Sequence, residues 1–294
     1  MPLKTPSVLG ELVANFNLKN LSFFKVGGSC DLFFSPYDQD DLSNFLKNSD
    51  FKITCLGNLS NALISDSGIR GCVINLVKYF NKIEFFEGFV KVGAGVLLPK
   101  FINECVKSGL SCLEKLYCVP GTIGGAVYMN AGIPEFDISK VLISFDCIDK
   151  NDGEVIILNK DNLNMEYRSG NIPQNLIITS VKLRTFYENV EKLKEIIGKI
   201  SEKRAKSQPL GKLTCGSAFK NPLGFKAWQL IKESDCDKLA VGDAIVSDMH
   251  CNFLINSGNA MASDFYKLIQ IIKEKVLKKT GILLEEEIII MGKY

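Results

Sequence analysis

An uncharged stretch at residues 116–134, LYCVPGTIGGAVYMNAGIP, limits the folds open to this chain more than any other feature. Its length is close to that of a membrane-spanning helix, which needs about 20 apolar residues. An uninterrupted helix is nevertheless excluded, because prolines and glycines occur at positions 120, 121, 124, 125, 132 and 134. A segment without charges is also a poor surface loop. We therefore expect a buried, glycine-rich loop in a soluble protein.

Composition sets wider bounds. The chain has 294 residues, 46% hydrophobic and 23% charged, which is ordinary for a globular protein with room for two domains. The formal net charge of +2 predicts no strong attraction to nucleic acid or to an anionic membrane. The first sixteen residues carry Lys4 and Glu11 and lack the apolar core of a signal peptide. We expect a cytoplasmic protein.

The ten cysteines form no C-x-x-C pair, and His250 is the only histidine. These spacings contain no zinc-site pattern, so we expect free thiols in a reducing cytosol and no bound metal.

Periodicity predicts an α+β fold. Helical patterns cover 38–48, 97–109 and 264–279, the last with Ser263 as its N-cap and Gly281 just past its end. A fourth, amphipathic helix begins near 188 and ends before Pro209. Strand patterns occupy 51–57, 72–76, 89–95, 154–159, 175–186 and 285–292. We expect two domains, residues 1–189 and 190–294.

Two glycine-rich loops are candidate ligand sites. The first, LGNLSNALISDSG at 56–68, could turn several main-chain N–H groups toward a phosphate, and its candidate residues are Gly57, Asn58, Ser60 and Asn61. It matches neither a Walker A loop nor G-x-G-x-x-G, and an ordinary turn is the alternative.

The second loop, VPGTIGGAVYMNAG at 119–132, would let the backbone approach a bulky ligand closely. Its candidate residues are Pro120, Gly121, Thr122, Gly124, Gly125 and Ala126. The alternative is a buried crossing of two backbones. Together the loops suggest a dinucleotide whose pyrophosphate is held by main chain, and spacing alone does not choose FAD among dinucleotides.

Several further motifs occur in a fixed order along the chain, and together they make the functional prediction more specific. FKVGGSCD at 24–31 precedes the two loops, and YRSG at 167–170, GSAFKNP at 216–222 and LEEEIIIMG at 284–292 follow them. The set strongly resembles the UDP-N-acetylenolpyruvoylglucosamine reductase (MurB) family over residues 20–292. No extra loop separates YRSG from GSAFKNP, which resembles the shorter, type II form.

The resemblance implies an FAD-binding α+β region of the PCMH/VAO-like type, built of two subdomains, followed by a smaller substrate-binding domain. It also implies an NADPH-dependent oxidoreductase of peptidoglycan synthesis. This enzyme would pass hydride from flavin N5 to the enolpyruvyl ether of UDP-N-acetylglucosamine, giving UDP-N-acetylmuramate. The expected partners are the UDP-sugar and NADPH, and the expected state is a monomer.

Three residues match the family's catalytic positions. Arg168 would grip the substrate carboxylate through its permanently charged, forked guanidinium. Ser217 would deliver a proton in a water-free site, and Glu287 would bind the substrate carboxylate in protonated form. Lys220 and Asn221 would help to bind the substrate. Without the resemblance, the three would be read as a surface charge, a turn serine and a solvent-facing strand residue.

The chain departs from the family pattern at three points. Leu59 replaces a glycine in the first loop, Cys118 replaces a glycine before VPGT, and Ile133-Pro134-Glu135 replaces Ala-Tyr-Gly. Two other functions stay open. One is a flavoprotein oxidase that uses O₂, against which the position of His250 far from the glycine loops counts. The other is a non-catalytic nucleotide-binding remnant.

Overall fold

The computed structural model describes residues 6–294, which form two compact units. The first unit comprises the chain up to Ala14, then Leu32–Asn58 and Gly71–Glu202. The second comprises Asn15–Asp31, Leu59–Arg70 and Lys203–Tyr294. The C-terminal unit therefore includes two segments from the N-terminal quarter of the chain. The domain limits 1–189 and 190–294 remain a prediction.

A four-stranded sheet with one helix lies mostly in the first unit. Its strand order is β1 (Glu11–Asn17), β2 (Ser29–Ser35), β5 (Ile69–Ile74) and β3 (Ile53–Cys55), with β3 and β5 parallel. Helix α1 (Gln39–Lys47) begins where the side chain of Asp38 accepts a hydrogen bond from the N–H of Asp41. Its apolar face packs onto the sheet through Phe45, whose ring lies 4.4 Å from that of Phe34.

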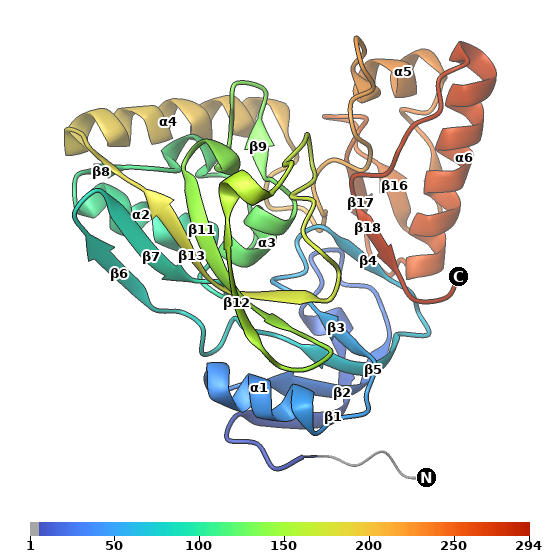
Figure 1. Ribbon diagram of the computed structural model, residues 1–294. Helices are drawn as coiled ribbons and strands as arrows, with labels where there is room; N and C mark the ends of the chain where they lie inside the picture. The colour runs from blue at the N-terminus through green and yellow to red at the C-terminus, as the bar shows by residue number, and fades with distance from the viewer. Residues whose placement is uncertain (1–5) are drawn as a thin grey trace. The chain divides into compact units, whose positions relative to one another are not determined.

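The same unit contains an antiparallel five-stranded sheet (Figure 1). The order is β12 (Val155–Asn159), β11 (Leu142–Asp149), β13 (Leu176–Arg184), β7 (Phe89–Gly93) and β6 (Ile83–Phe86). Helices α2 (Leu98–Lys107) and α3 (Ile123–Tyr128) share its core. Both sheets contribute to one buried cluster, which includes Phe34, Val92, Phe101 and Phe145. Pro99 stands in the first turn of α2, where its missing N–H costs nothing.

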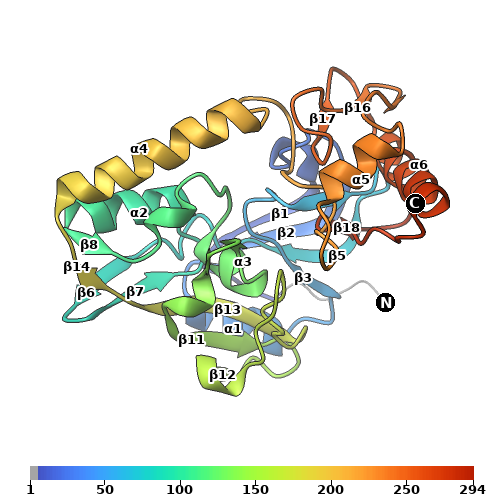
Figure 2. The same ribbon diagram turned by 90° about the horizontal axis from the view of Figure 1, so that it is seen from above.

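The long helix α4 (Val190–Ser207) follows β14 (Phe186–Tyr187), which pairs with β8 (Leu110–Ser111). Figure 2 shows α4 running beside α2. Leu193 is its only fully buried residue, and the other residues of its predicted apolar face, Ile196, Ile197 and Ile200, are half-buried. None of the helices within residues 6–294 combines the length and apolar character that crossing a membrane requires.

The segment 116–134 is more regular than the sequence predicts. It is only partly buried, with Pro120, Gly125, Tyr128 and Pro134 exposed, and it contains α3 rather than loop alone, so the expectation of a buried loop is only partly correct. The Thr122 hydroxyl accepts a hydrogen bond from the N–H of Gly125 at 3.2 Å and caps the helix. Two distant carbonyls, of Val96 and Ala94, accept from Ile123 and Gly124 at 2.9 Å. Glycine's low helix propensity is thus offset by contacts that are remote in sequence.

The second unit is built around helix α6 (Ala262–Thr280), which packs on β15 (Ala240–Val241) and β16 (Ala244–Val246). These strands continue antiparallel to β17 (Leu254–Asn256), and α5 (Ala227–Glu233) packs on α6 (Figure 1). Strand β18 (Ile289–Met291) pairs in parallel with β4 (Ala62–Ile64), bringing the C-terminal motif beside the first glycine-rich loop.

The predicted helix 264–279 is confirmed, and Gly281 ends it with a left-handed φ of 72°. The predicted N-cap is wrong, because the cap position is Met261. The carboxylate of Asp66 instead accepts from the N–H groups of Ala262 and Ser263 at 2.8 and 2.9 Å. A carboxylate at this end of the helix also complements its dipole.

Candidate active site

The two glycine-rich loops touch each other in the first unit. A Cβ placed on Gly57 would lie 2.8 Å from the hydroxyl of Thr122, so a larger residue there would force the two loops to shift. Asn75 is buried, and its amide donates to the carbonyls of Leu56 and Gly57 at 2.9 and 2.8 Å. The loop carbonyls are therefore engaged on one side, which leaves the N–H groups for another partner.

Some main-chain N–H groups of both loops have no acceptor among the described residues. Within residues 6–294, those of Gly57, Asn58 and Thr122 donate no hydrogen bond. Where main-chain N–H groups without an internal acceptor point to one place, they can bind an anion such as pyrophosphate. Helix α3 itself does not supply them, since its first N–H groups are occupied by Val96, Ala94 and Thr122. The loops thus fit the pyrophosphate of a dinucleotide such as FAD through their backbone.

Leu59, which replaces the family's glycine, has a backbone conformation that favours glycine. Its φ is +50°, in the left-handed region, and its side chain is only 4% exposed. Its carbonyl accepts from the N–H of Phe23 at 3.4 Å and from the Cys215 thiol at 3.8 Å. Leu59 therefore combines a left-handed backbone conformation with a side chain buried in the protein interior.

Arg168 lies in a tight turn braced by the second glycine-rich loop. Glu166 and Ser169 pair across the turn, and Arg168 has a left-handed φ of +59°. The Asn130 amide donates to the Glu166 carbonyl at 2.8 Å, and the Arg168 guanidinium donates to the Gly132 carbonyl at 2.8 Å. Backbone strain at a charged residue is typical of functional positions.

Asn130 carries a second feature. It is 4% exposed, and its side-chain oxygen, unlike its amide nitrogen, has no hydrogen-bond partner within residues 6–294. A buried acceptor without a donor costs about 1–3 kcal/mol. This oxygen lies at the end of the candidate cofactor loop, and a ligand donor would remove that cost.

Ser217 and Glu287 come together in the second unit. The N–H of Glu287 donates to the carbonyl of Ala218 at 2.8 Å, and Phe219 pairs with Glu286. Gly216 precedes the serine with φ +81°, a conformation that favours glycine. Asn61 of the first loop donates its amide to the Glu287 carbonyl at 2.9 Å. The structure thus gathers three predicted site residues from three distant parts of the chain.

Lys220 and Asn221 make contacts of their own. The Lys220 ammonium lies 3.5 Å from the Glu285 carboxylate, in a largely exposed pair. The Asn221 side chain accepts from the N–H of Ala227 at 2.9 Å, which supports the start of α5. Asn221 therefore has a structural role that the sequence did not predict.

The sequence analysis overlooked Asn75, Asn130 and Asn252, three buried asparagines that bind main chain next to predicted site residues. A lone asparagine gives no periodic signal. For Asn75 and Asn130 the only indication is that each follows a run of apolar residues, where an amide side chain is unexpected, and Asn252 lacks even this signal.

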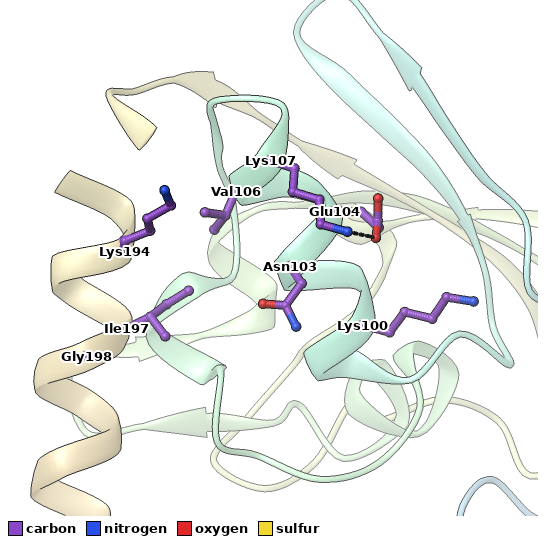
Figure 3. A pocket seen from close by; sticks show the side chains of 8 residues that line it. All are labelled: Lys100, Asn103, Glu104, Val106, Lys107, Lys194, Ile197 and Gly198. Atoms are coloured by element: carbon purple, nitrogen blue, oxygen red, sulfur yellow. Dashed lines mark hydrogen bonds and ion pairs between the residues drawn. The ribbon is translucent and has the colours of Figure 1, made fainter. Parts of the chain in front are cut away.

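An open hollow of about 670 Å³ lies between α2 and α4 (Figure 3). Lys100, Lys107 and Lys194 surround it, and Lys107 pairs with Glu104 at 2.8 Å. It contains none of the predicted site residues.

Comparisons with known proteins agree with this arrangement. A family model described as UDP-N-acetylenolpyruvoylglucosamine reductase, C-terminal domain, matches residues 208–291, and one described as FAD binding domain matches residues 31–159. The α+β fold with an FAD-binding domain is thereby confirmed.

The chain is 42% identical to the UDP-N-acetylenolpyruvoylglucosamine reductase of Orientia tsutsugamushi (strain Ikeda), over 99% of this chain and 98% of the relative. Identity to the Rickettsia typhi enzyme of the same name is 37%, over 98% of both chains. The crystal structure of the reductase (MurB) from Thermus caldophilus superposes with a TM-score of 0.84 at 31% identity, covering 97% of this chain and all of the other. This chain belongs to the UDP-N-acetylenolpyruvoylglucosamine reductase family.

Proposed function

We propose that this protein reduces the enolpyruvyl ether of UDP-N-acetylglucosamine to the lactyl ether, giving UDP-N-acetylmuramate for peptidoglycan synthesis. FAD is the cofactor and NADPH the co-substrate. The observation that carries the proposal is the hydrogen bond from Glu287 to Ala218, which holds the Ser217 and Glu287 segments side by side. The reaction adds one hydride and one proton across a carbon–carbon double bond.

The cofactor region is assigned to residues 1–189 and the substrate-binding domain to 190–294. FAD, when bound, supplies the hydride transfer from NADPH to the double bond. The residues assigned to hold it are Gly57, Asn58, Ser60 and Asn61 in the first loop and Pro120, Gly121, Thr122, Gly124, Gly125 and Ala126 in the second. The contact between Gly57 and Thr122 and the available N–H groups of Gly57, Asn58 and Thr122 support the assignment of these three residues, whereas the N–H groups of Gly124, Gly125 and Ala126 are occupied within the protein.

Arg168 binds the substrate carboxylate, on which negative charge grows as hydride reaches the terminal carbon. A guanidinium holds a carboxylate through two parallel hydrogen bonds, which fixes orientation as well as charge. The bracing of the Arg168 turn by Asn130 and Gly132 supports this role, because a preorganised donor need not rearrange during the reaction.

Ser217 donates its hydroxyl proton to the carbon next to the carboxylate. A serine holds its proton tightly, so it acts as an acid only toward a strongly basic carbon centre shielded from water. Glu287 in its protonated form hydrogen-bonds the substrate carboxylate. Lys220 lowers the cost of ionising the Ser217 hydroxyl, and Asn221 binds the phosphates or sugar of the substrate. The enzyme acts as a cytoplasmic monomer.

An anaerobic titration in two steps tests the function. Purified protein should be yellow, NADPH should bleach it, and the enolpyruvyl UDP-sugar should restore the colour. Restoration by O₂ and not by the sugar nucleotide would indicate the oxidase alternative. A colourless protein that takes up no FAD would indicate the non-catalytic alternative.

A further inference from the structure

We propose that Asn252 is a positioning residue that sets the register of the Ser217 segment. Its side chain makes the two hydrogen bonds that a neighbouring β-strand would make. The Phe219 N–H donates to Asn252 Oδ1 at 3.0 Å, and Asn252 Nδ2 donates to the Phe219 carbonyl at 2.8 Å. Asn252 is 4% exposed, so both bonds are shielded from water. The proposal rests on the proposed function.

The main chain of the same residue adds a third contact. The Asn252 carbonyl accepts from the N–H of Ala218 at 2.7 Å, and Ser217 pairs with Phe253. Three consecutive residues, Ser217 to Phe219, are therefore held by residues 252 and 253. The main chain of residues 252 and 253 pairs with Ser217 and Ala218. The Asn252 side chain extends this pairing to Phe219.

The opposite side of the segment is held by the strand that contains Glu287. The main-chain N–H of Glu287 donates to the carbonyl of Ala218 at 2.8 Å. The main-chain N–H of Lys220 donates to the carbonyl of Glu285 at 2.9 Å. The segment 217–219 therefore lies between Asn252 on one side and the strand that contains Glu287 on the other. Loss of the Asn252 amide donor would leave the buried Phe219 carbonyl unpaired and let the segment slide against Glu287.

A small shift at this place has a large expected effect. Proton transfer depends on near-contact geometry, and a displacement of about 1 Å can cost about 10²-fold in rate. Asn252 touches Ala218 and Phe219, and Ser217 acts on the substrate, so the effect of Asn252 passes through the backbone. Cofactor binding and reduction by NADPH do not require this register.

Asn256, the last residue of β17, provides a matched control four positions further along the chain. It is 6% exposed, and its side chain makes three main-chain hydrogen bonds, to Phe24, Gly258 and Ala260. None of these bonds involves residues 217–219. Replacement of either asparagine by aspartate keeps the shape and removes one amide donor, so general loss of stability should be similar in both.

The test compares Asn252→Asp, Asn252→Ser and Asn256→Asp in the FAD-loaded protein. Both Asn252 variants should be reduced by NADPH at the wild-type rate and re-oxidised by the enolpyruvyl UDP-sugar about 10²-fold more slowly. Their solvent deuterium isotope effect on re-oxidation should rise, because proton transfer limits the rate. Asn256→Asp should keep the wild-type rate and isotope effect. Asn252→Ser also shows that the added charge of aspartate is not the cause.

Hydrogen exchange gives a readout without turnover: the Phe219 amide should exchange faster in Asn252→Ser than in Asn256→Asp. Unchanged re-oxidation in a folded Asn252 variant, or equal slowing in the Asn256 variant, would overturn the positioning role. If Asn252→Asp fails to fold, Asn252→Ser decides. Failure of wild-type protein to be re-oxidised by the sugar nucleotide would instead refute the proposed function.

Discussion

The N–H of Glu287 donates a hydrogen bond to the carbonyl of Ala218 at 2.8 Å. This bond joins two motifs that lie 69 positions apart in the chain, and it places Ser217 and Glu287 on adjacent segments of the second unit. Asn252 supports the same segment from its other side. The proposed proton donor is thus held in a rigid backbone setting, as a preorganised acid requires.

Gly57→Ala should weaken FAD binding while the protein remains folded. The added methyl would meet the Thr122 hydroxyl at 2.8 Å and force the two loops apart. Loss of about one backbone hydrogen bond to the cofactor corresponds to about tenfold in affinity. Titration of the apoprotein with FAD, followed by fluorescence, measures this.

Gly198→Ala in α4 is the control, because nothing lies within 4 Å of its added methyl. Alanine in a helix should raise stability by about 0.5–1 kcal/mol and leave FAD affinity unchanged. Equal FAD affinity in the Gly57 variant and the wild type would show that the loops do not bind the pyrophosphate.

Leu59→Gly should destabilise the protein although it restores the family's residue. Glycine would relieve the left-handed φ of +50°, worth about 1–2 kcal/mol. It would also remove a side chain that is only 4% exposed, and deleting a buried leucine costs about 2–5 kcal/mol. Chemical unfolding should therefore show a net loss. A gain in stability would mean that backbone strain outweighs packing here.

Arg168→Lys should impair turnover of the UDP-sugar. Lysine cannot reproduce the forked, planar donor, nor the hydrogen bond to the Gly132 carbonyl at 2.8 Å. Losing a charge-assisted bond of about 1.5–3 kcal/mol predicts a fall of about 10–100-fold in kcat/KM. Arg184→Lys, on an exposed arginine of β13, should change nothing. Near-wild-type turnover of Arg168→Lys would contradict the carboxylate-binding role.

His250 should make stability depend on pH. Its Nδ1 accepts from the N–H of Asn252 at 3.3 Å, so the neutral ring carries its proton on Nε2, and burial lowers its pKa from the usual 6.5. The unfolded chain then binds the proton more tightly than the folded protein does. The contribution of neutral His250 to the free energy of unfolding is complete above pH 6.5. It is lost as the pH falls from 6.5 through the lowered pKa of the folded protein. The free energy of unfolding should decline more steeply in wild type than in His250→Gln. Equal slopes would contradict this.

Local patterns predicted the elements that depend on local interactions. The helix expected at 38–48 is Gln39–Lys47, and that expected at 264–279 is Ala262–Thr280. Helix α3 escaped prediction because Val96 and Ala94 stabilise its first turn. The cap of α6 escaped it because Asp66 lies 196 positions away. Sequence periodicity carries no information about such distant partners.

The candidate site also contains residues that the sequence predicted and residues that it did not. The ordered motifs predicted Ser217, Glu287 and Arg168 as site residues, and the structure brings the segments of the first two together. The asparagines that hold the backbone around them were not identifiable, because a single amide side chain has no pattern. Leu59 shows a further limit: the sequence marks it as a substitution, while only the structure shows its left-handed φ and its burial.

Rapid mixing of the Ser217→Ala protein under anaerobic conditions tests the central claim most directly. The two half-reactions are measured separately: bleaching by NADPH, then return of colour with the enolpyruvyl UDP-sugar. Bleaching should proceed at the wild-type rate, while return of colour should slow by about 10²–10⁴-fold, the range for a lost general acid. Equal slowing of both steps, or an unchanged second step, would contradict the assignment of Ser217 as the proton donor.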